Sequence, residues 1–269
     1  MSGSMTCTFV QITDHHLREA EDDLTCGYST AYAFRVVLEH MAGHVIDDID
    51  FLVSTGDAVD VPSDDGYQHV CRLLDARSGA DGAPGHRIVS VGHRRDVPMV
   101  FLAGNHDDRD RFFRWLVPQT SPRPLHNFAF EHGGVRFIGL DWGAPAKAFG
   151  HPEMFRFLRE SLAADVPSVL LLHHHVVPSG IPWVDDFIAE NVHELWPILR
   201  GRPVLGIFCG HAHCTYETTV GDVPVFGLRS TAPQFVPQET PLYCIQPLHY
   251  RWVRIEDGVL TTRIFEVPL

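Results

Sequence analysis

Residues 98–107 read Pro-Met-Val-Phe-Leu-Ala-Gly-Asn-His-Asp, an apolar run of strand length that stops at a glycine and gives way to polar side chains. A run of this kind is typical of a strand buried in an α/β sheet. Four other apolar runs end in a similar way, at Asp14-His15-His16, Gly56-Asp57, His173-His174-His175 and Gly210-His211-Ala212-His213. Ligands of open α/β sheets bind in the crevice beyond the carboxyl ends of the strands. We therefore expect the five ends to meet at one edge.

Strands and helices are predicted to alternate over the first two thirds of the chain. Alternating or short apolar runs predict strands at 6–12, 50–54, 98–103, 128–130, 135–140, 168–172 and 204–208. Helical spacing of apolar residues predicts helices at 29–45 (with Ser29 as N-cap), 66–77, 107–116, 152–163 and 185–199. The Gly-rich stretch 78–97 is predicted to be a long loop or lid. Residues 1–269 are thus interpreted as one α/β domain, rich in β-hairpins from about 215.

The composition limits the class of protein. The 269 residues are 45% hydrophobic, enough for a large core, and the net charge of −13 disfavours a nucleic-acid polymer as partner. The six cysteines include no C-x-x-C pair, which is typical of reduced thiols. The N-terminus lacks the features of a signal peptide, and no uncharged apolar run approaches the roughly 20 residues of a membrane span. We therefore expect a cytoplasmic protein without membrane contact.

The five predicted strand ends offer carboxylates, an amide and imidazoles. These ligands suit borderline metals such as Zn, Mn, Fe and Co. In Asp14-x-His16, side-chain alternation along a strand would let both residues reach one ion, and His211-x-His213 has the same spacing. Each motif alone has a plainer interpretation, because Gly-Asp often marks a turn and Asn-His can cap a helix. The complete set, each member ending an apolar run, predicts a metal site.

The order Asp-x-His, Gly-Asp, Gly-Asn-His-Asp, His and Gly-His-x-His resembles that of the calcineurin-like metallophosphoesterases. The resemblance runs from about Thr8 to His213. Within the superfamily, the chain is similar to bacterial class III cyclic-nucleotide phosphodiesterases and glycerophosphodiesterases. This resemblance implies a four-layer α/β/β/α sandwich of two mixed β-sheets flanked by helices. It also implies two divalent or trivalent metal ions (Mn, Fe, Zn or Co) as cofactors.

The resemblance further implies which residues bind the two metals, with Asp57 bridging both ions. The first set is Asp14, His16, Asp57 and His213. The second set is Asp57, Asn105, His173 and His211. His106 would lie beside the phosphorus as the catalytic acid or charge stabiliser. The residues expected to contact the substrate are Asn105, His106 and His213.

The register of the histidine motif stays open. The family often continues its single histidine as His-His-Pro-Pro, whereas residues 173–177 read His-His-His-Val-Val. His173 is chosen as the ligand because it directly follows the apolar run, and His174 is the alternative. His15 and His175 are interpreted as structural or solvent-facing.

These assignments predict a metal-dependent phosphodiesterase acting on a small-molecule substrate. A hydroxide bridging the two metals would attack the phosphorus of a 3′,5′-cyclic nucleotide such as cAMP, or of a glycerophosphodiester. Protonation of the leaving oxygen suits a group that titrates near neutral pH, which favours His106. The alternatives are a phosphomonoesterase, including a protein phosphatase, and a binding module that has lost catalysis. The negative net charge of the chain disfavours a DNA nuclease, which would need a basic surface for the DNA backbone.

Three further features have more than one interpretation. Arg87, Arg94 and Arg95 either contact substrate phosphate or belong to a solvated loop. The final segment, with Tyr243-Cys244 and residues 248–253, either covers the active site, forms a subunit contact or packs as a late hairpin. The resemblance also suggests a homo-oligomer, a dimer or larger.

Overall fold

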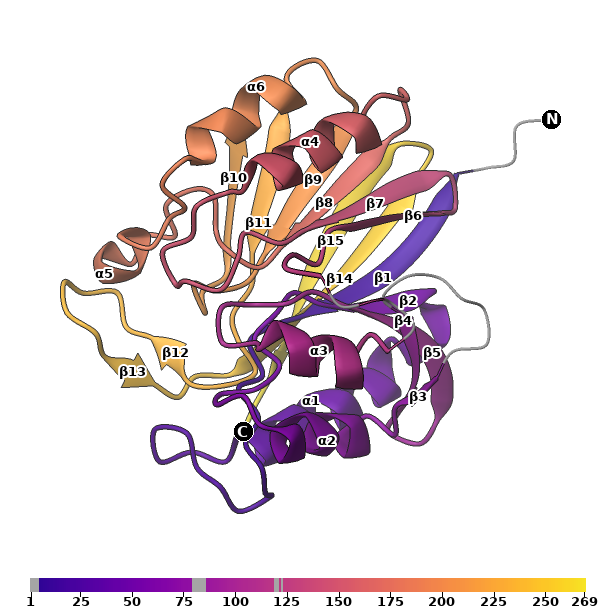
Figure 1. Ribbon diagram of the computed structural model, residues 1–269. Coiled ribbons are helices and arrows are strands. Elements are labelled where there is room, and N and C mark those ends of the chain that lie inside the picture. The colour runs from indigo at the N-terminus through magenta and orange to yellow at the C-terminus, as the bar shows by residue number, and fades with distance from the viewer. Residues whose placement is uncertain (1–4, 79–85, 119–120, 122) are drawn as a thin grey trace.

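The computed structural model describes residues 5–78, 86–118, 121 and 123–269 (Figure 1). Within these residues, a first sheet combines parallel and antiparallel neighbours. Its strands, in spatial order, are β15 (Val259–Val267), β14 (Leu248–Glu256), β1 (Thr6–Ile12), β2 (Phe51–Ser54), β5 (Arg95–Phe101), β4 (His86–Val91) and β3 (Arg77–Ser78). The parallel strands β1, β2 and β5 lie at its centre, so their carboxyl ends meet at one edge.

A second sheet is also mixed, with parallel pairing from β7 through β8 and β9 to β11. Its strands, in spatial order, are β10 (Tyr216–Val220), β11 (Val223–Gly227), β9 (Val204–Cys209), β8 (Ser168–Leu172), β7 (Val135–Leu140) and β6 (Phe128–His132). A separate short pair consists of β12 (Gln234–Phe235) and β13 (Tyr243–Cys244).

Helices cover the outer face of each sheet (Figure 1). The first sheet carries α1 (Thr30–His44), α2 (Asp64–Leu73) and α3 (Arg109–Trp115), followed along the chain by α4 (Pro152–Ser161) and α6 (Leu195–Leu199) on the second. The short turns η1 (Ile46–Asp48), α5 (Pro182–Asp185) and η2 (Val192–Glu194) connect them. The predicted four-layer sandwich is confirmed. None of the described helices has the length and apolarity needed to cross a bilayer.

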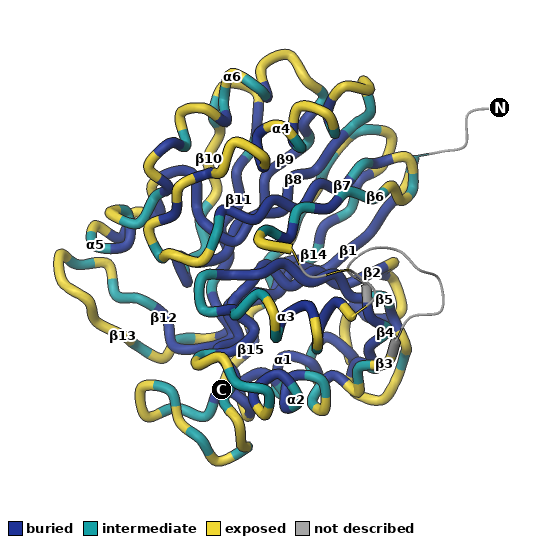
Figure 2. The backbone as a smooth tube through the Cα atoms, in the orientation of Figure 1, coloured by how far each residue is buried: buried dark blue, intermediate teal, exposed yellow. Residues whose placement is uncertain are grey.

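Phenylalanine rings fill the space between the two sheets. Phe9 of β1 stacks on Phe51 at 5.4 Å and meets Phe137 and Phe208 of the second sheet edge-on at 5.5 and 5.4 Å. Offset and edge-to-face ring pairs add about 0.5–1.5 kcal/mol each to the stabilisation by burial. Figure 2 shows that the inner strands of both sheets are buried, whereas connecting loops and outer turns are exposed. The sheets are thus held face to face by an apolar layer.

Most predicted elements are present, with two exceptions. Ser29 caps α1 as expected, because its side chain accepts a hydrogen bond from the Tyr32 backbone amide. The helix predicted at 185–199 is wrong as one continuous helix, since α5 ends at Asp185 and the helical segments η2 and α6 begin only at Val192. The loop predicted at 78–97 is wrong where the chain is described, because β4 and the start of β5 form an antiparallel hairpin. Residues 79–85 lie outside the described residues.

The three arginines of that hairpin bind backbone carbonyls. Arg87 donates to the carbonyl of Trp115, Arg94 to that of Ala42 at 2.9 Å, and Arg95 to that of Ile46 at 2.7 Å. These contacts attach the hairpin to the helices and loops beside the first sheet. The arginines therefore have a structural role, and none of them lines the pocket described below.

Arg251 of β14 joins the two sheets through a buried guanidinium. It donates to the Glu217 carboxylate of β10 at 2.7 Å and to the carbonyl of Gly227 at 3.0 Å. Its guanidinium also lies over the Phe226 ring, 5.0 Å from the centroid. Because β14 belongs to the first sheet and these partners to the second, Arg251 ties the layers together. The stretch 248–253 is accordingly a packed hairpin strand, paired with β15 along its length and with β1 from Arg251 onward.

Replacing Arg251 with alanine should lower the free energy of unfolding by about 2–3 kcal/mol. This is less than the roughly 3–5 kcal/mol of a fully buried pair, because the Glu217 side chain is 55% exposed. Urea denaturation measures the difference. Arg254→Ala is the matched control on the same strand, since its ion pair with Glu256 is exposed and should contribute less than about 0.5 kcal/mol. Equal effects of the two changes would refute the role of Arg251.

Candidate metal centre

The carboxyl ends of both sheets lie against each other at one edge of the sandwich. His173, after β8, donates its Nδ1 proton to the carbonyl of Thr55, after β2, at 2.8 Å. Gln11 of β1 donates to the carbonyl of Cys209 at the end of β9 at 3.1 Å. The five motifs that end apolar runs in the sequence are therefore brought together, as predicted.

Left-handed backbone concentrates at this edge. Nine non-glycine residues of the described chain have positive φ, and five of them are predicted metal ligands: Asp14, His16, Asp57, His211 and His213. Such conformations cost about 1–3 kcal/mol each and cluster at functional sites. The strand alternation proposed for Asp14-x-His16 is not what aligns the pair. β1 ends at Ile12, and both residues lie beyond it with φ of 53° and 45°.

A first group of donors consists of Asp14, His16 and His213. The Nδ1 of His213 donates to the carbonyl of Pro233 at 2.7 Å, so its Nε2 presents a lone pair to the site. That Nε2 lies 3.4 Å from Asp14 Oδ1 and 3.1 Å from His16 Nε2. Burial lowers the pKa of His16, which favours the neutral imidazole that binds metals. Two buried ring nitrogens facing a carboxylate are suited to sharing a cation.

A second group consists of Asp57, His173 and His211, with Asn105 beside them. His173 Nε2 lies 3.3 Å from Asp57 Oδ2 and 2.9 Å from Asn105 Oδ1. His211 Nε2 is buried without a hydrogen-bond partner among the described residues. Asp57 Oδ2 is also 3.6 Å from His16 Nε2, in the first group. The Asp57 carboxylate therefore lies between the two groups, where a bridging ligand is expected.

The electrostatics of the two donor groups favour the binding of cations. Burial alone would raise the pKa of Asp57, but His173 and His16 outweigh it and hold that pKa well below its ordinary value. Burial likewise opposes a charge on His173, yet Asp57 and Asp14 raise its pKa to about 9. Burial, reinforced by His174 and His173, lowers the pKa of His211 well below its ordinary value. Ionised carboxylates, a neutral imidazole and an orphaned ring nitrogen fit a metal centre.

Two glycines allow the strand ends to approach so closely. A Cβ on Gly104 would lie 2.1 Å from Asp57 Oδ1, and one on Gly210 would lie 2.7 Å from Asp14 Oδ2. Asp107, the last residue of the Gly-Asn-His-Asp motif, fixes the same loops. It accepts hydrogen bonds from the backbone amides of Gly104 and Ala58 at 2.9 and 3.3 Å.

His106 and Asp60 complete the site. His106 donates its Nδ1 proton to the carbonyl of Asp60 at 2.8 Å, and its backbone amide donates to Asp57 Oδ1 at 2.8 Å. The Asp60 carboxylate lies 3.6 Å from His16 Nδ1 and orients that ring. Asp60 was not predicted from the sequence, although the spacing Gly56-Asp57-x-x-Asp60 contains the signal. The sequence pattern does not show that the loop after β2 places the Asp60 carboxylate beside His16, which lies 44 residues earlier in the chain.

The neighbouring histidines are all buried. His15 uses both ring nitrogens, bound to Thr231 and Ser54 at 2.9 and 3.0 Å, so it is structural. His174 points Nε2 to the carbonyl of Pro145 at 3.0 Å. The geometry favours His173 over His174 as the ligand. His175 is fully buried, so the solvent-facing alternative for it is wrong.

A pocket of about 270 Å³ opens above the two donor groups. Asn105, His106 and His213, the predicted substrate contacts, all line it. Its far wall is aromatic, built by Trp183, Phe235 and Tyr243. The Phe235 ring stacks on His213 with centroids 4.1 Å apart. The site thus pairs a polar floor with an apolar wall, as small-molecule pockets do.

The sequence pattern of calcineurin-like phosphoesterases matches residues 7–215, more than three quarters of the chain. The chain belongs to this family. The predicted superfamily and the predicted enzyme class, a hydrolase of phosphoric esters, are thereby confirmed. Together with the clustered His and Asp side chains, family membership also supports a metal centre in this phosphoesterase.

Curated relatives of the phosphoesterase align over nearly all of it. It is 28% identical to the 3′,5′-cyclic adenosine monophosphate phosphodiesterase CpdA of Escherichia coli K12, over 98% of this chain and 91% of that protein. It is 29% identical to the CpdA of Pseudomonas aeruginosa, over 96% and 89% of the two chains. The predicted similarity to cyclic-nucleotide phosphodiesterases is confirmed.

Solved structures share the fold at lower identity. A dimetal phosphatase from Danio rerio superposes with a TM-score of 0.60 at 15% identity, covering 97% of this chain and 99% of that one. GAP50 of Plasmodium gives 0.61 at 13% identity, with 98% and 85% covered. Both support the sandwich architecture of the phosphoesterase.

Gly104→Ala should displace Asp57 and weaken metal binding, because the added Cβ would clash with its carboxylate and its backbone amide. We expect a loss of bound Mn, measured by elemental analysis, and a loss of about 1–3 kcal/mol in unfolding free energy from overpacking. Gly43→Ala is the control, since it lies in α1 with open space around it and should be neutral or stabilising. Full metal content in Gly104→Ala would contradict the close approach.

Proposed function

We propose that this phosphoesterase is a cyclic-nucleotide phosphodiesterase with a centre of two metal ions. The observation that supports it most directly is the place of Asp57, shared by two donor groups at the floor of an aromatic-walled pocket. Relatives named as cyclic adenosine monophosphate phosphodiesterases align over 98% and 96% of the chain, a span that includes the pocket residues after 215. A glycerophosphodiester stays as the alternative diester, and a phosphomonoester as the alternative class.

The ligands proposed for the two ions follow the two groups. One ion is held by Asp14, His16, Asp57 and His213. The other is held by Asp57, Asn105, His173 and His211. When bound, such a pair of ions supplies Lewis-acid activation of water and neutralises charge on the phosphoryl group. The chain itself contributes pre-oriented donors, because hydrogen bonds to Thr55 and Pro233 fix the tautomers of His173 and His213.

His106 is proposed as the general acid. It lines the pocket beside the donor groups, and its Nδ1 is committed to the Asp60 carbonyl, which leaves Nε2 for the leaving oxygen. Burial opposes its charge, but Asp57 and then Asp60 raise its pKa above the ordinary value. The imidazolium that an acid requires is thus favoured near neutral pH. His106 also lies within reach of His16 and Asp57, so a role as ligand is the alternative.

The aromatic wall is proposed to hold the nucleobase. Phe235 and Tyr243 come from the β12–β13 pair, and Trp183 packs on Phe235 with ring centroids 4.6 Å apart. Stacking of a base on an aromatic side chain contributes about 1–3 kcal/mol. The part of the final segment around Tyr243 therefore borders the active site. An aromatic wall of this kind supports a nucleotide over a glycerol ester as the substrate, because only the nucleotide carries a base that can stack on it.

A substrate comparison tests the proposal. With Mn, Fe, Zn or Co supplied, the protein should hydrolyse cAMP and bis(p-nitrophenyl) phosphate faster than p-nitrophenyl phosphate. Phe235→Ala should raise KM for cAMP by roughly 5- to 150-fold, the equivalent of about 1–3 kcal/mol of lost stacking. Phe149→Ala, an exposed aromatic outside the pocket, is the control. Glycerophosphocholine or p-nitrophenyl phosphate as the best substrate would overturn the cyclic-nucleotide assignment.

His106→Ala should keep both metals but lower kcat by roughly 10²–10⁴, the contribution of a general acid. Because an acid must be protonated, kcat of the unaltered enzyme should fall as pH rises through the raised pKa of His106. The variant should lack this alkaline limb. His193→Ala changes an exposed histidine outside the pocket, so it should leave kcat and its pH dependence unchanged. Loss of a metal from His106→Ala would identify His106 as a ligand.

The single-domain organisation, the homo-oligomer, the cytoplasmic location and the exclusion of nucleic-acid polymers stay predictions. So does the identity of the metals.

A further inference from the structure

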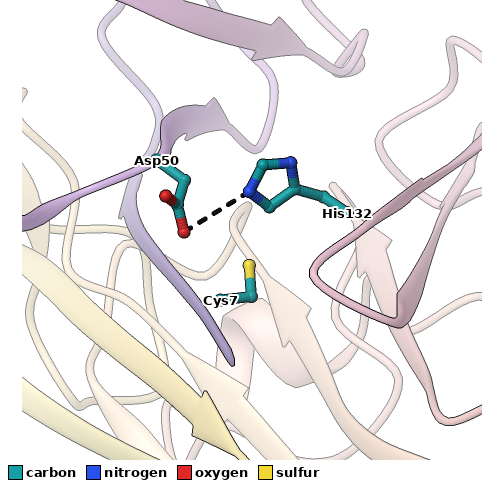
Figure 3. Close-up of side chains that lie close together, drawn as sticks. All are labelled: Cys7, Asp50 and His132. Carbon is teal, nitrogen blue, oxygen red and sulfur yellow. Dashed lines mark ion pairs between the residues drawn. The ribbon is translucent and has the colours of Figure 1, made fainter. Parts of the chain in front are cut away.

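A second cluster of metal-binding side chains lies at the opposite edge of the sandwich. Cys7 is near the start of β1, Asp50 directly precedes β2, and His132 ends β6. The candidate metal centre lies beyond the carboxyl ends of β1 and β2, so these amino ends are far from it. Figure 3 shows the three side chains pointing toward one another from separate segments.

The three ligand atoms are close enough to share an ion. Asp50 Oδ2 lies 3.4 Å from His132 Nε2, and the Cys7 sulfur, one Asp50 carboxylate oxygen and one His132 ring nitrogen all lie within 4.8 Å of one another. Tetrahedral coordination with bonds of about 2.0–2.3 Å separates ligands by roughly 3.3–3.8 Å. Side-chain rotation alone covers the difference, because the Asp50 and His132 side chains are 40% and 45% exposed.

The backbone around the cluster holds it in place. Asp50 and Thr8 are bonded reciprocally: Thr8 N donates to Asp50 Oδ2 at 2.8 Å, and Asp50 N donates to the Thr8 carbonyl at 2.7 Å. Gly133, at the β6–β7 turn, approaches β1 so closely that a Cβ there would lie 2.2 Å from the Thr6 carbonyl. This approach sets His132 over Cys7. The ring of His132 also meets Phe51 edge-on at 5.7 Å.

We infer that Cys7, Asp50 and His132 bind a borderline divalent cation such as Zn²⁺, which joins the first sheet to the second. One sulfur, one nitrogen and one oxygen ligand select Zn²⁺ or Co²⁺ over Mg²⁺ and Ca²⁺. The half-exposed Asp50 and His132 leave a solvent-facing fourth position for water. The buried Cys7 lies beneath them, in the phenylalanine-rich layer between the sheets.

Coordination requires the thiolate of Cys7. Burial, followed by the charge of Asp50, raises the pKa of that thiol to about 12, so the thiol is protonated at neutral pH. Binding therefore forms the bond between sulfur and metal and releases the thiol proton to solvent. The ion also neutralises the Asp50 charge, which otherwise opposes ionisation of the thiol.

Cobalt titration tests this site separately from the catalytic one. Co²⁺ bound by thiolate gives a near-ultraviolet charge-transfer band, and the proposed catalytic ligands include no cysteine. The chelator-stripped full-length protein should develop this band as Co²⁺ is added. Cys7→Ser should abolish it and reduce the bound Co²⁺ by one ion per chain. Cys26→Ser, which alters an exposed cysteine in the catalytic pocket, should retain the band.

His132→Asn changes a half-exposed side chain, so it keeps the test decisive if Cys7→Ser fails to fold. It should weaken Co²⁺ binding at the band by at least about tenfold, as losses of metal-site groups commonly do. Zn²⁺ should also raise the melting temperature more in the unaltered protein than in His132→Asn. Absence of the band, or a band that disappears in Cys26→Ser instead, would overturn the inference.

Discussion

The structure depends on how closely the carboxyl ends of its two sheets approach. Asp14, after β1, lies against the backbone of Gly210, after β9 of the second sheet, and Asp57, after β2, lies against Gly104, after the neighbouring strand β5; a methyl group at either glycine would collide with a carboxylate. This contact is polar on both sides, so the phenylalanine layer between the sheets, at some distance from it, supplies the cohesion. Cohesion and site chemistry therefore depend on different parts of the molecule. Apolar burial holds the two sheets together. The buried charged groups at the carboxyl edge need not contribute cohesion, so they can be placed where their charges compensate one another.

The strained backbone and the buried charges at that edge have the same explanation. Asp14 and His16 leave β1 in left-handed conformations, which point side chains sideways into the gap between the sheets. The ionised Asp57 is compensated there by the charge of His173, whose ring would have to give up a proton before its nitrogen could bind a cation. Such an arrangement stores unfavourable energy that a bound divalent cation would relieve. Stability and ligation are therefore linked at this site, and the rigid hydrogen bonds of Asp107 keep the loops from relaxing.

Much of this arrangement could be predicted from the sequence, because apolar runs of strand length mark where each buried strand ends. The order of motifs then indicated which ends meet. The conformation of Asp14-x-His16 could not be predicted, since left-handed φ values leave no pattern of alternation. The β4–β5 hairpin could not be predicted, because its polar residues are typical of a loop. The backbone carbonyls that Arg87 and Arg95 bind belong to elements distant in the sequence. Asp60 and the aromatic wall depend on contacts between segments far apart in the chain.

The stacking of Phe235 on His213 connects two properties that are usually treated separately. His213 belongs to the candidate metal centre, while Phe235 belongs to the β12–β13 pair that borders the pocket. The Pro233 carbonyl accepts a hydrogen bond from His213 just before that pair. A movement of this hairpin to accommodate a ligand therefore shifts an imidazole at the same time. If His213 binds a cation as proposed, occupancy of the pocket and affinity for the cation would alter each other to an equal extent by linkage. A substitution in the β12–β13 pair that alters the pocket would then also alter the position of the His213 ring.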